Sequence, residues 1–254
     1  MQVWTTVADW LERRRSITNR SIGFVPTMGS LHVGHASLVE QCRRENEVAV
    51  VSIFVNPTQF NNPQDLERYP RTLEQDLALL ERRGTDDVLA PAVTELYPLG
   101  RRFRVEEEGL TGIMEGAYRP GFFSGVMTVV LKLLNLVKAD RAYFGEKDFQ
   151  QLKVIADMVK DFFIPTEIIP RPTVREASGL AASSRNALLS PAAHDQAAFL
   201  YCALSRSVSP EEARAQLEAN GFVVDYVEEH WGRRFAAVNL ESVRLIDNVP
   251  VSRG

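Results

Sequence analysis

The segment Gly23-Phe-Val-Pro-Thr-Met-Gly-Ser-Leu-His-Val-Gly-His35 decides the fold of this chain. Its apolar start predicts a buried strand, Pro-Thr-Met-Gly predicts a tight loop, and the rest predicts the first turn of a helix. His32 and His35 are three residues apart and therefore share one helix face, while Gly34 leaves space for a ligand. Helix N-termini present unpaired N–H groups and partial positive charge. The segment therefore predicts a site for an anion such as a phosphate.

Strand and helix patterns alternate through the first two thirds of the chain, which predicts a parallel sheet covered by helices on both faces. The expected fold class is α/β, a Rossmann-like doubly wound parallel sheet with a second, smaller α+β C-terminal domain. Ligands of such sheets bind beyond the carboxyl ends of the strands, so the loops 26–29, 57–69 and 145–148 should gather at one edge. We expect helices at 6–15, up to about 44, at 73–83, 125–137 and 148–162, and strands at 21–27, 47–56, 87–90, 103–107 and 141–144.

The last third of the chain has a different pattern. Three prolines punctuate an extended segment over 165–172, and Ser-Pro pairs at 190 and 209 predict the starts of two helices. Residues 222–228 and 236–246 have strand patterns. The expected domains are therefore 1–172 and 173–254, the second of which carries the Ser183-Ser184-Arg185 loop.

Composition describes an ordinary globular protein. The chain has 254 residues, 45% of them hydrophobic, and a formal net charge of -4. The slightly acidic balance argues against a nucleic-acid partner, and no uncharged stretch approaches the length of a membrane span. The N-terminal residues lack the apolar core of a signal peptide, which predicts a cytoplasmic protein without a membrane partner. Cys42 and Cys202 lie within helical patterns and are expected to be reduced, buried thiols.

From the residues alone, His32 and His35 fit phosphate binding, half a metal site or ordinary packing. Zinc is disfavoured because no third histidine, cysteine or paired acid stands nearby in the sequence. In the phosphate interpretation, the imidazoles donate hydrogen bonds to oxygens on which charge builds up during displacement.

Pro26-Thr-Met-Gly-Ser-Leu-His-Val-Gly-His35 resembles the HxGH signature of the nucleotidyltransferase superfamily, which includes class I aminoacyl-tRNA synthetases. Further segments resemble the pantoate–β-alanine ligase family more narrowly. The likeness runs in order from about residue 22 to 190 and leaves the last sixty-odd residues without a diagnostic pattern. The segments are Phe54-Val-Asn-Pro-Thr-Gln-Phe60, Tyr69-Pro-Arg-Thr72, Arg119–Lys132, Tyr143-Phe-Gly-Glu-Lys-Asp-Phe-Gln-Gln151 and Gly179-Leu-Ala-Ala-Ser-Ser-Arg-Asn186.

The resemblance implies a ligase of pantothenate biosynthesis that works in two steps. ATP and pantoate form pantoyl-adenylate and pyrophosphate, and the amine of β-alanine then attacks the mixed anhydride and releases AMP. Such transfers depend mainly on positioning and charge stabilisation. The resemblance also implies ATP as co-substrate, Mg²⁺ and a homodimer.

The resemblance assigns residues to ATP. His35 would donate a proton, with His32 as its partner on the phosphates, and Lys147 would act as a point charge. Ser183, Ser184 and Arg185 take the place of the mobile KMSKS loop of the synthetases and would clamp the departing pyrophosphate. The implied ATP contacts are Met28, Gly29, Ser30, Leu31, His32, Val33, Gly34, His35, Gly145, Glu146, Lys147, Asp148, Val174, Ala182, Ser183, Ser184 and Arg185.

By the resemblance, Gln59 and Gln151 would hold pantoate, and an amide suits this ligand because it donates to a carboxylate and accepts from a hydroxyl. Asn56 and Tyr69 are expected to line the same pocket. Asp76 is the candidate magnesium contact, since ATP chemistry favours a hard cation with oxygen ligands.

The chain departs from the family pattern at Val33, Ser178 and Ala182, which affects loop packing and the adenine pocket rather than the reaction. Two other functions stay open at this point. A related nucleotidyltransferase acting on another small acid is disfavoured by the two glutamine motifs. A catalytically silent nucleotide or RNA sensor would be expected to lack the histidines or to add a basic domain, and the sequence shows neither.

Overall fold

The computed structural model describes residues 1–251, which form two compact units. The first unit comprises Met1–Gly145 and Gln150–Arg171, and the second comprises Glu146–Phe149 and the chain from Pro172 onward. The division into functional domains at 1–172 and 173–254 stays a prediction. Within residues 1–251, no helix is both long enough and apolar enough to cross a membrane.

The first unit is built on a six-stranded sheet in the order β1-β4-β3-β2-β5-β6, in which every neighbouring pair is parallel. This confirms the predicted α/β class. β2 lies in the middle and pairs in register with β3 along its whole length. The strands are β1 (Gln2–Trp4), β2 (Ile22–Thr27), β3 (Val48–Ile53), β4 (Asp87–Leu89), β5 (Arg141–Gly145) and β6 (Glu167–Arg171).

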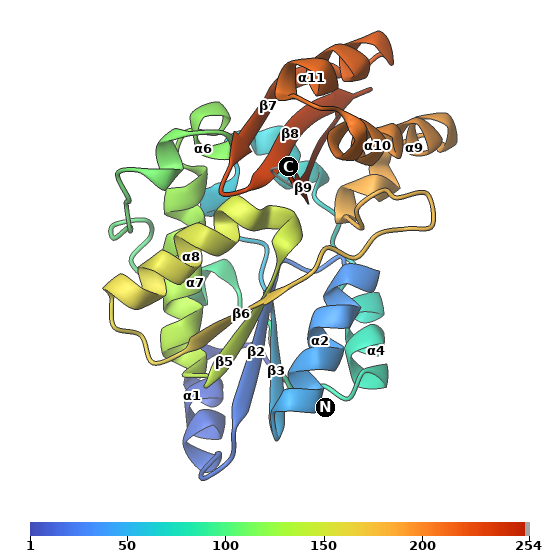
Figure 1. Cartoon of the computed structure of the whole chain (residues 1–254). Coiled ribbons are helices and arrows are strands. Elements are labelled where there is room, and N and C mark those ends of the chain that lie inside the picture. The colour runs from blue at the N-terminus through green and yellow to red at the C-terminus, as the bar shows by residue number, and fades with distance from the viewer. Residues whose placement is uncertain (252–254) are drawn as a thin grey trace. The chain divides into compact units, whose positions relative to one another are not determined.

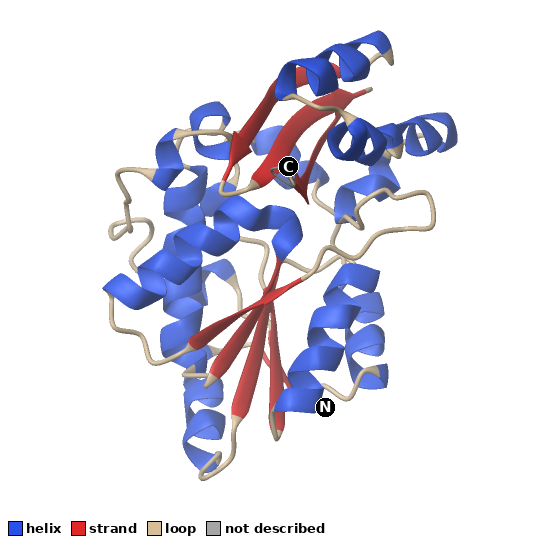
Figure 2. Ribbon diagram, viewed as in Figure 1, coloured by secondary structure: helices blue, strands red, loops and turns tan. Residues whose placement is uncertain are grey.

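Helices cover both faces of this sheet (Figure 2). Two lie against one face, α2 (Val33–Glu45) and α4 (Leu73–Arg82), and their buried side chains form a cluster with β2, β3 and β4. On the other face lie α1 (Val7–Ser16), α7 (Phe122–Val137) and α8 (Phe149–Asp161) (Figure 1). The short helices of this unit are η1 (Pro57–Gln59), α3 (Pro63–Arg68), α5 (Val93–Leu96), η2 (Leu110–Gly112) and α6 (Glu115–Tyr118).

One predicted strand in this unit is wrong, and two observed strands were not predicted. Residues 103–107 form no strand: Val105 donates its N–H to the Thr128 hydroxyl of helix α7 and not to a neighbouring strand. β1 was not predicted because it has only three residues at the sheet edge. β6 was expected only as part of an extended segment punctuated by prolines, and Pro170 is tolerated in this strand because β6 is the other edge of the sheet.

The second unit has an antiparallel sheet of β7 (Val223–His230), β8 (Arg233–Leu240) and β9 (Val243–Pro250), in that order. Helices α10 (Phe199–Arg206) and α11 (Pro210–Ala219) pack on this sheet through a shared apolar core (Figure 1). Together they confirm the predicted α+β character. The remaining elements are η3 (Glu146–Asp148), η4 (Ser184–Leu188) and α9 (Pro191–Ala197).

Both predicted Ser-Pro helix starts are confirmed, since the hydroxyls of Ser190 and Ser209 accept backbone N–H bonds in the first turns of α9 and α11. The predicted single strand 236–246 is wrong. A turn with Glu241 at a φ of 53° separates β8 from β9, and the apolar pattern continues across it. Cys42 is buried as expected, whereas Cys202 is only half-buried.

Candidate active site

The loop between β2 and α2 is held by the carboxylate of Asp76, which lies on α4 and is 3% exposed. Oδ2 accepts the N–H of Ser30 at 2.9 Å, and Oδ1 accepts the N–H of Leu31 at 2.8 Å. Gly29 and Ser30 both have left-handed backbones, with φ of 79° and 51°. A Cβ at Gly29 would lie 3.0 Å from Asp76 Oδ2, so glycine is required there for conformation and for space.

These contacts do not fit Asp76 as a metal ligand. Oδ1 also accepts the Thr72 hydroxyl at 3.2 Å, so both carboxylate oxygens bind protein donors. Within the described part of the chain, no cluster of three or more His, Cys, Asp or Glu side chains could hold a metal ion. The contact of Asp76 with Mg²⁺ stays a prediction, and its hydrogen bonds indicate a role in fixing the loop instead.

His32 and His35 lie at the start of α2, and each ring accepts a backbone N–H bond there. His32 is the N-cap, and its Nδ1 accepts the N–H of Gly34 at 3.1 Å. The Nδ1 of His35 accepts the N–H of His32 at 3.4 Å, and the ring centroids are 4.1 Å apart. Because each Nδ1 accepts a hydrogen bond, each neutral ring carries its proton on Nε2. Each imidazole therefore presents an Nε2–H donor at a helix N-terminus.

The segment after β3 is organised by Asn56, which is 1% exposed. Its Nδ2 donates to Gln59 Oε1 at 3.0 Å and to the carbonyl of Gly125 at 3.1 Å. Its Oδ1 accepts from the hydroxyls of Thr58 and Tyr97, both at 2.9 Å. Burial raises the pKa of Tyr97, opposed by its contact with Thr58, so the phenol keeps the proton that it donates.

This arrangement separates the roles of Asn56 and Gln59, which the sequence placed together in the pantoate pocket. The amide of Asn56 is occupied by protein groups. The Oε1 of Gln59 is bound by Asn56, so its NH₂ group is the end that can donate to a carboxylate. Gly125 allows this packing, because a Cβ there would lie 2.4 Å from the carbonyl oxygen of Thr58.

Tyr69 and Gln151 are the remaining predicted pantoate residues in the first unit. Tyr69 is buried, and its ring packs edge-on against Phe60 at a centroid distance of 5.6 Å. Gln151 lies half-buried in the first turn of α8, next to the buried Gln150. Gln150 holds the chain around α6, because it donates to the Leu110 and Ile113 carbonyls and accepts from the N–H of Glu115.

Sequence reasoning assigned no role to Arg119, although it lies within the family-like segment 119–132. Its Nη2 donates to the backbone carbonyl of Gln59 at 3.3 Å, and its guanidinium stacks 3.6 Å from the centre of the Phe122 ring. Its side chain is 20% exposed and also pairs with Glu115. The structure thus adds a cation next to the predicted pantoate glutamine.

In the second unit, residues 174–182 form a small hairpin before the Ser-Ser-Arg segment. The N–H of Ala182 donates to the Val174 carbonyl, and that of Glu176 to the Leu180 carbonyl, both at 2.9 Å. Gly179 has a φ of 94°, and a Cβ there would lie 2.7 Å from Tyr201. Only glycine fits this turn.

Ser183, Ser184 and Arg185 follow directly. The Ser183 hydroxyl accepts the N–H of Arg185 at 3.3 Å and caps η4, which Ser184 begins. Asn186 ties this segment back to the hairpin, since its amide donates to Glu176 Oε1 at 3.0 Å and to the Ala181 carbonyl at 3.1 Å. All three predicted residues are half-buried and adjacent.

Lys147 also belongs to the second unit, in the short helix η3. Its side chain is 19% exposed, with Nζ 3.9 Å from Asp148 Oδ1. The neighbouring Glu146 pairs with Arg233 at 3.4 Å. Burial lowers the pKa of Arg233 from its usual value, while Glu146 and Asp247 oppose this shift.

Together, the parallel sheet and the histidine-capped helix after its central strand define an α/β protein of the nucleotidyltransferase type of architecture predicted from the sequence. The pantoate-beta-alanine ligase family model matches residues 2–250. The chain therefore belongs to the pantoate-beta-alanine ligase family, and it is an enzyme of the ligase class. The resemblance found in the sequence is confirmed.

Individual relatives agree with the family match. The chain is 52% identical over 231 residues to pantothenate synthetase of Bdellovibrio bacteriovorus, covering 91% of this chain and 92% of the relative. It is 49% identical over 249 residues to pantothenate synthetase of Legionella pneumophila, covering 98% and 99%. A crystal structure of pantoate-beta-alanine ligase from Francisella tularensis, complexed with beta-gamma ATP and beta-alanine, superposes with a TM-score of 0.95 at 42% identity, covering 98% and 97%.

Proposed function

We propose that this enzyme joins pantoate and β-alanine to pantothenate with ATP, through a pantoyl-adenylate. The observation that supports this most directly is the pair of imidazoles at the start of α2, each with Nδ1 bound to backbone and Nε2 as its donor. The related Francisella tularensis enzyme was crystallised with beta-gamma ATP and beta-alanine. ATP as co-substrate and β-alanine as acceptor follow for this chain by family membership.

In the first step, a carboxylate oxygen of pantoate attacks the α-phosphorus of ATP. The bond between this phosphorus and the oxygen bridging to the β-phosphate breaks, and pyrophosphate leaves. His32 and His35 would stabilise the charge on the phosphate oxygens through their Nε2–H groups. The Ser30 and Leu31 amides are committed to Asp76, so that carboxylate holds the loop in the shape that presents the histidines.

Lys147, Ser183, Ser184 and Arg185 would neutralise the departing pyrophosphate. A lysine supplies a compact positive charge, and an arginine supplies a planar set of donors that matches phosphate oxygens. Val174, Ala182, Gly145, Glu146 and Asp148 remain proposed ATP contacts by resemblance. No step of this mechanism is routed through Mg²⁺, because the contacts of Asp76 do not fit a metal ligand.

Pantoate would be oriented by Gln59 and Gln151. The Asn56 bond to Gln59 Oε1 directs the Gln59 NH₂ group to the acid, and Arg119 adds positive charge beside it. In the second step, the uncharged amine of β-alanine attacks the acyl carbon, the bond from this carbon to the AMP oxygen breaks, and the nitrogen loses a proton. Exclusion of water would protect the acyl-adenylate until then.

Exchange of labelled pyrophosphate into ATP tests the proposal. We expect exchange only when pantoate is present, and AMP rather than ADP after β-alanine is added. Exchange independent of pantoate, or ADP as product, would contradict the adenylate mechanism. We also propose a cytoplasmic homodimer, on the family resemblance, and sedimentation of the purified enzyme tests the dimer.

A further inference from the structure

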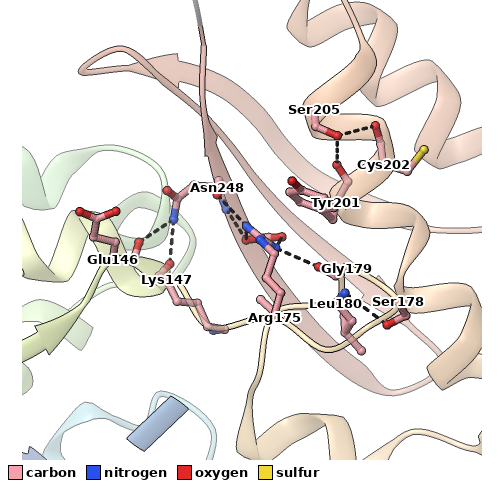
Figure 3. A network of polar contacts seen from close by, with 12 residues as sticks. Glu146, Lys147, Arg175, Ser178, Gly179, Leu180, Tyr201, Cys202, Ser205 and Asn248 are labelled. Carbon is pink, nitrogen blue, oxygen red and sulfur yellow. Dashed lines mark hydrogen bonds and ion pairs between the residues drawn. The ribbon is translucent and has the colours of Figure 1, made fainter. Parts of the chain in front are cut away.

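The amide of Asn248, near the end of β9, holds the turn that carries Lys147. Its Nδ2 donates one hydrogen bond to the Glu146 carbonyl and one to the Lys147 carbonyl, both at 2.9 Å (Figure 3). Its Oδ1 accepts from Arg233 Nε. The residue is 1% exposed, so its side-chain donors and acceptor are all satisfied in a buried setting.

The preceding residue, Asp247, serves the hairpin that leads to Ser183. Its two carboxylate oxygens bind the Arg175 guanidinium at 2.6 and 2.9 Å, and its side chain is 2% exposed. Arg175 in turn donates to the Gly179 carbonyl at 3.1 Å and stacks on the Tyr201 ring (Figure 3).

The two residues are also linked to each other. The N–H of Asn248 donates to Asp247 Oδ1 at 2.8 Å, and the Asn248 carbonyl accepts from Arg175 Nη2 at 3.2 Å. One dipeptide of β9 thus contacts two segments of the second unit, the Glu146–Asp148 turn and the 174–182 hairpin. Both segments carry predicted ATP contacts, although neither lies near β9 in the sequence.

We propose that Asn248 is a positioning residue for ATP, which acts by holding the Glu146-Lys147 backbone. This inference rests on the proposed role of Lys147 in phosphate binding. A lysine side chain is flexible, so its use as a fixed charge depends on how well its backbone is held. An amide suits the task, because its NH₂ group brings two donors to two adjacent carbonyls without burying a charge.

Two substitutions and a matched control test this. Asn248→Ala removes both bonds, and the isosteric Asn248→Asp places a carboxylate oxygen against the two carbonyls. Asn239→Ala is the control: Asn239 lies in the same sheet and its amide also binds a side chain, that of Asp225 at 3.0 Å. The measurements are hydrogen exchange of residues 146–149 without ligand, and KM values for ATP and β-alanine.

We expect Asn248→Ala to speed exchange at 146–149 and to raise KM for ATP, each by about tenfold, which corresponds to the loss of one to two net hydrogen bonds. KM for β-alanine should stay within about twofold of the wild type, in keeping with the ordinary size of distant effects. Asn248→Asp should act in the same direction and more strongly, and Asn239→Ala should change neither quantity. Where the alanine variant fails to fold, the same measurements are made on Asn248→Ser, which keeps one donor in the buried site.

Unchanged exchange at 146–149 in both Asn248 variants would overturn the proposal. So would faster exchange with an unchanged KM for ATP, because the contact would then be structural only. If the wild type itself shows no pantoate-dependent pyrophosphate exchange, the proposed function fails, and this inference fails with it. If the wild type shows pantoate-dependent pyrophosphate exchange but the Asn248 variants keep the wild-type hydrogen exchange and KM for ATP, only this inference is contradicted.

Discussion

Asp76 accepts the backbone N–H of Leu31 at 2.8 Å, so a buried carboxylate on α4 shapes the loop that presents the two histidines. The same carboxylate binds the N–H of Ser30. Two donors from one loop converge on one acidic side chain that lies 45 and 46 residues away from them in the sequence. The loop geometry is therefore set from outside the motif that contains it.

Asp76→Asn should disturb this loop, because one oxygen becomes an NH₂ group that faces a backbone donor. We expect a loss of about 1 to 3 kcal/mol of stability, the cost of an unsatisfied buried donor, and a higher KM for ATP. Thermal unfolding and steady-state kinetics measure these effects. Glu74→Gln, on the exposed side of the same helix, should change neither.

The same variant separates two roles of Asp76. If Asp76 fixes the loop, the Mg²⁺ concentration for half-maximal rate should stay the same in Asp76→Asn. A large rise in that concentration with an unchanged KM for ATP would instead support the predicted metal contact.

His35→Ala should reduce kcat by about a hundredfold or more, the usual contribution of a positioned proton donor. The melting temperature should fall much less, because the ring is half-buried and its bond to the N–H of His32 is long, at 3.4 Å. Rate assays and thermal unfolding on the same preparation compare the two. A variant that unfolds, or one that keeps full rate, would favour the packing interpretation.

Asn56→Ala should raise KM for pantoate by about tenfold and leave KM for ATP unchanged, because it frees the amide of Gln59 and removes one to two net hydrogen bonds. Asn62→Ala provides the control. Asn62 is also a helix-capping asparagine of this segment, but it is exposed. Equal effects of the two substitutions on KM for pantoate would refute a specific role of Asn56.

Gly125→Ala should move η1, because the new Cβ would lie 2.4 Å from the Thr58 carbonyl oxygen and 2.6 Å from its carbon. Backbone cannot yield as a flexible side chain does, so we expect a loss of about 1 to 3 kcal/mol and weaker pantoate binding. At Gly112 an added Cβ meets no atom within 4 Å, and Gly112→Ala should be neutral. Calorimetric titration with pantoate compares binding by the two variants, and urea unfolding compares their stability.

Cys42 should be inert to alkylation in the native enzyme. Burial raises its pKa from 9.0 to about 12, helped by Asp86 and Glu45, so its thiolate is about a thousandfold rarer at neutral pH than in the unfolded chain. Iodoacetamide labelling of the Cys202→Ser variant, in which Cys42 is the one thiol left, should be slow in buffer and fast in urea. Fast native labelling would show that the thiol is accessible.

The raised pKa of Cys42 also predicts how stability depends on pH. Above about pH 9 the unfolded chain releases this proton and the native protein keeps it until about pH 12. The native state then binds more protons, so the free energy of unfolding should fall as pH rises through this window. In a Cys42→Ser variant, the fall between pH 9 and 10.5 should be smaller.

Much of the site was predictable because it is local in the chain. The β2–loop–α2 unit depends on contacts between close neighbours, such as the His32 cap on Gly34 and the left-handed Gly29. The prediction of a phosphate site needed only strand pattern, loop residues and histidine spacing. By contrast, residues 103–107 have a strand-like pattern but no strand beside them, which their own sequence does not reveal.

The sequence by itself determined the α/β class, the strand–loop–helix unit with His32 and His35, and membership of the ligase family. Only the tertiary structure decided that Asp76 fixes that loop, that Asn56 orients Gln59 with the help of Tyr97 and α7, and that Asn248 holds the turn of Lys147. The physical reason is the range of the interactions. Helix caps and turns involve neighbours in the chain, whereas buried polar side chains take whatever partner the fold brings to them, up to 102 residues away.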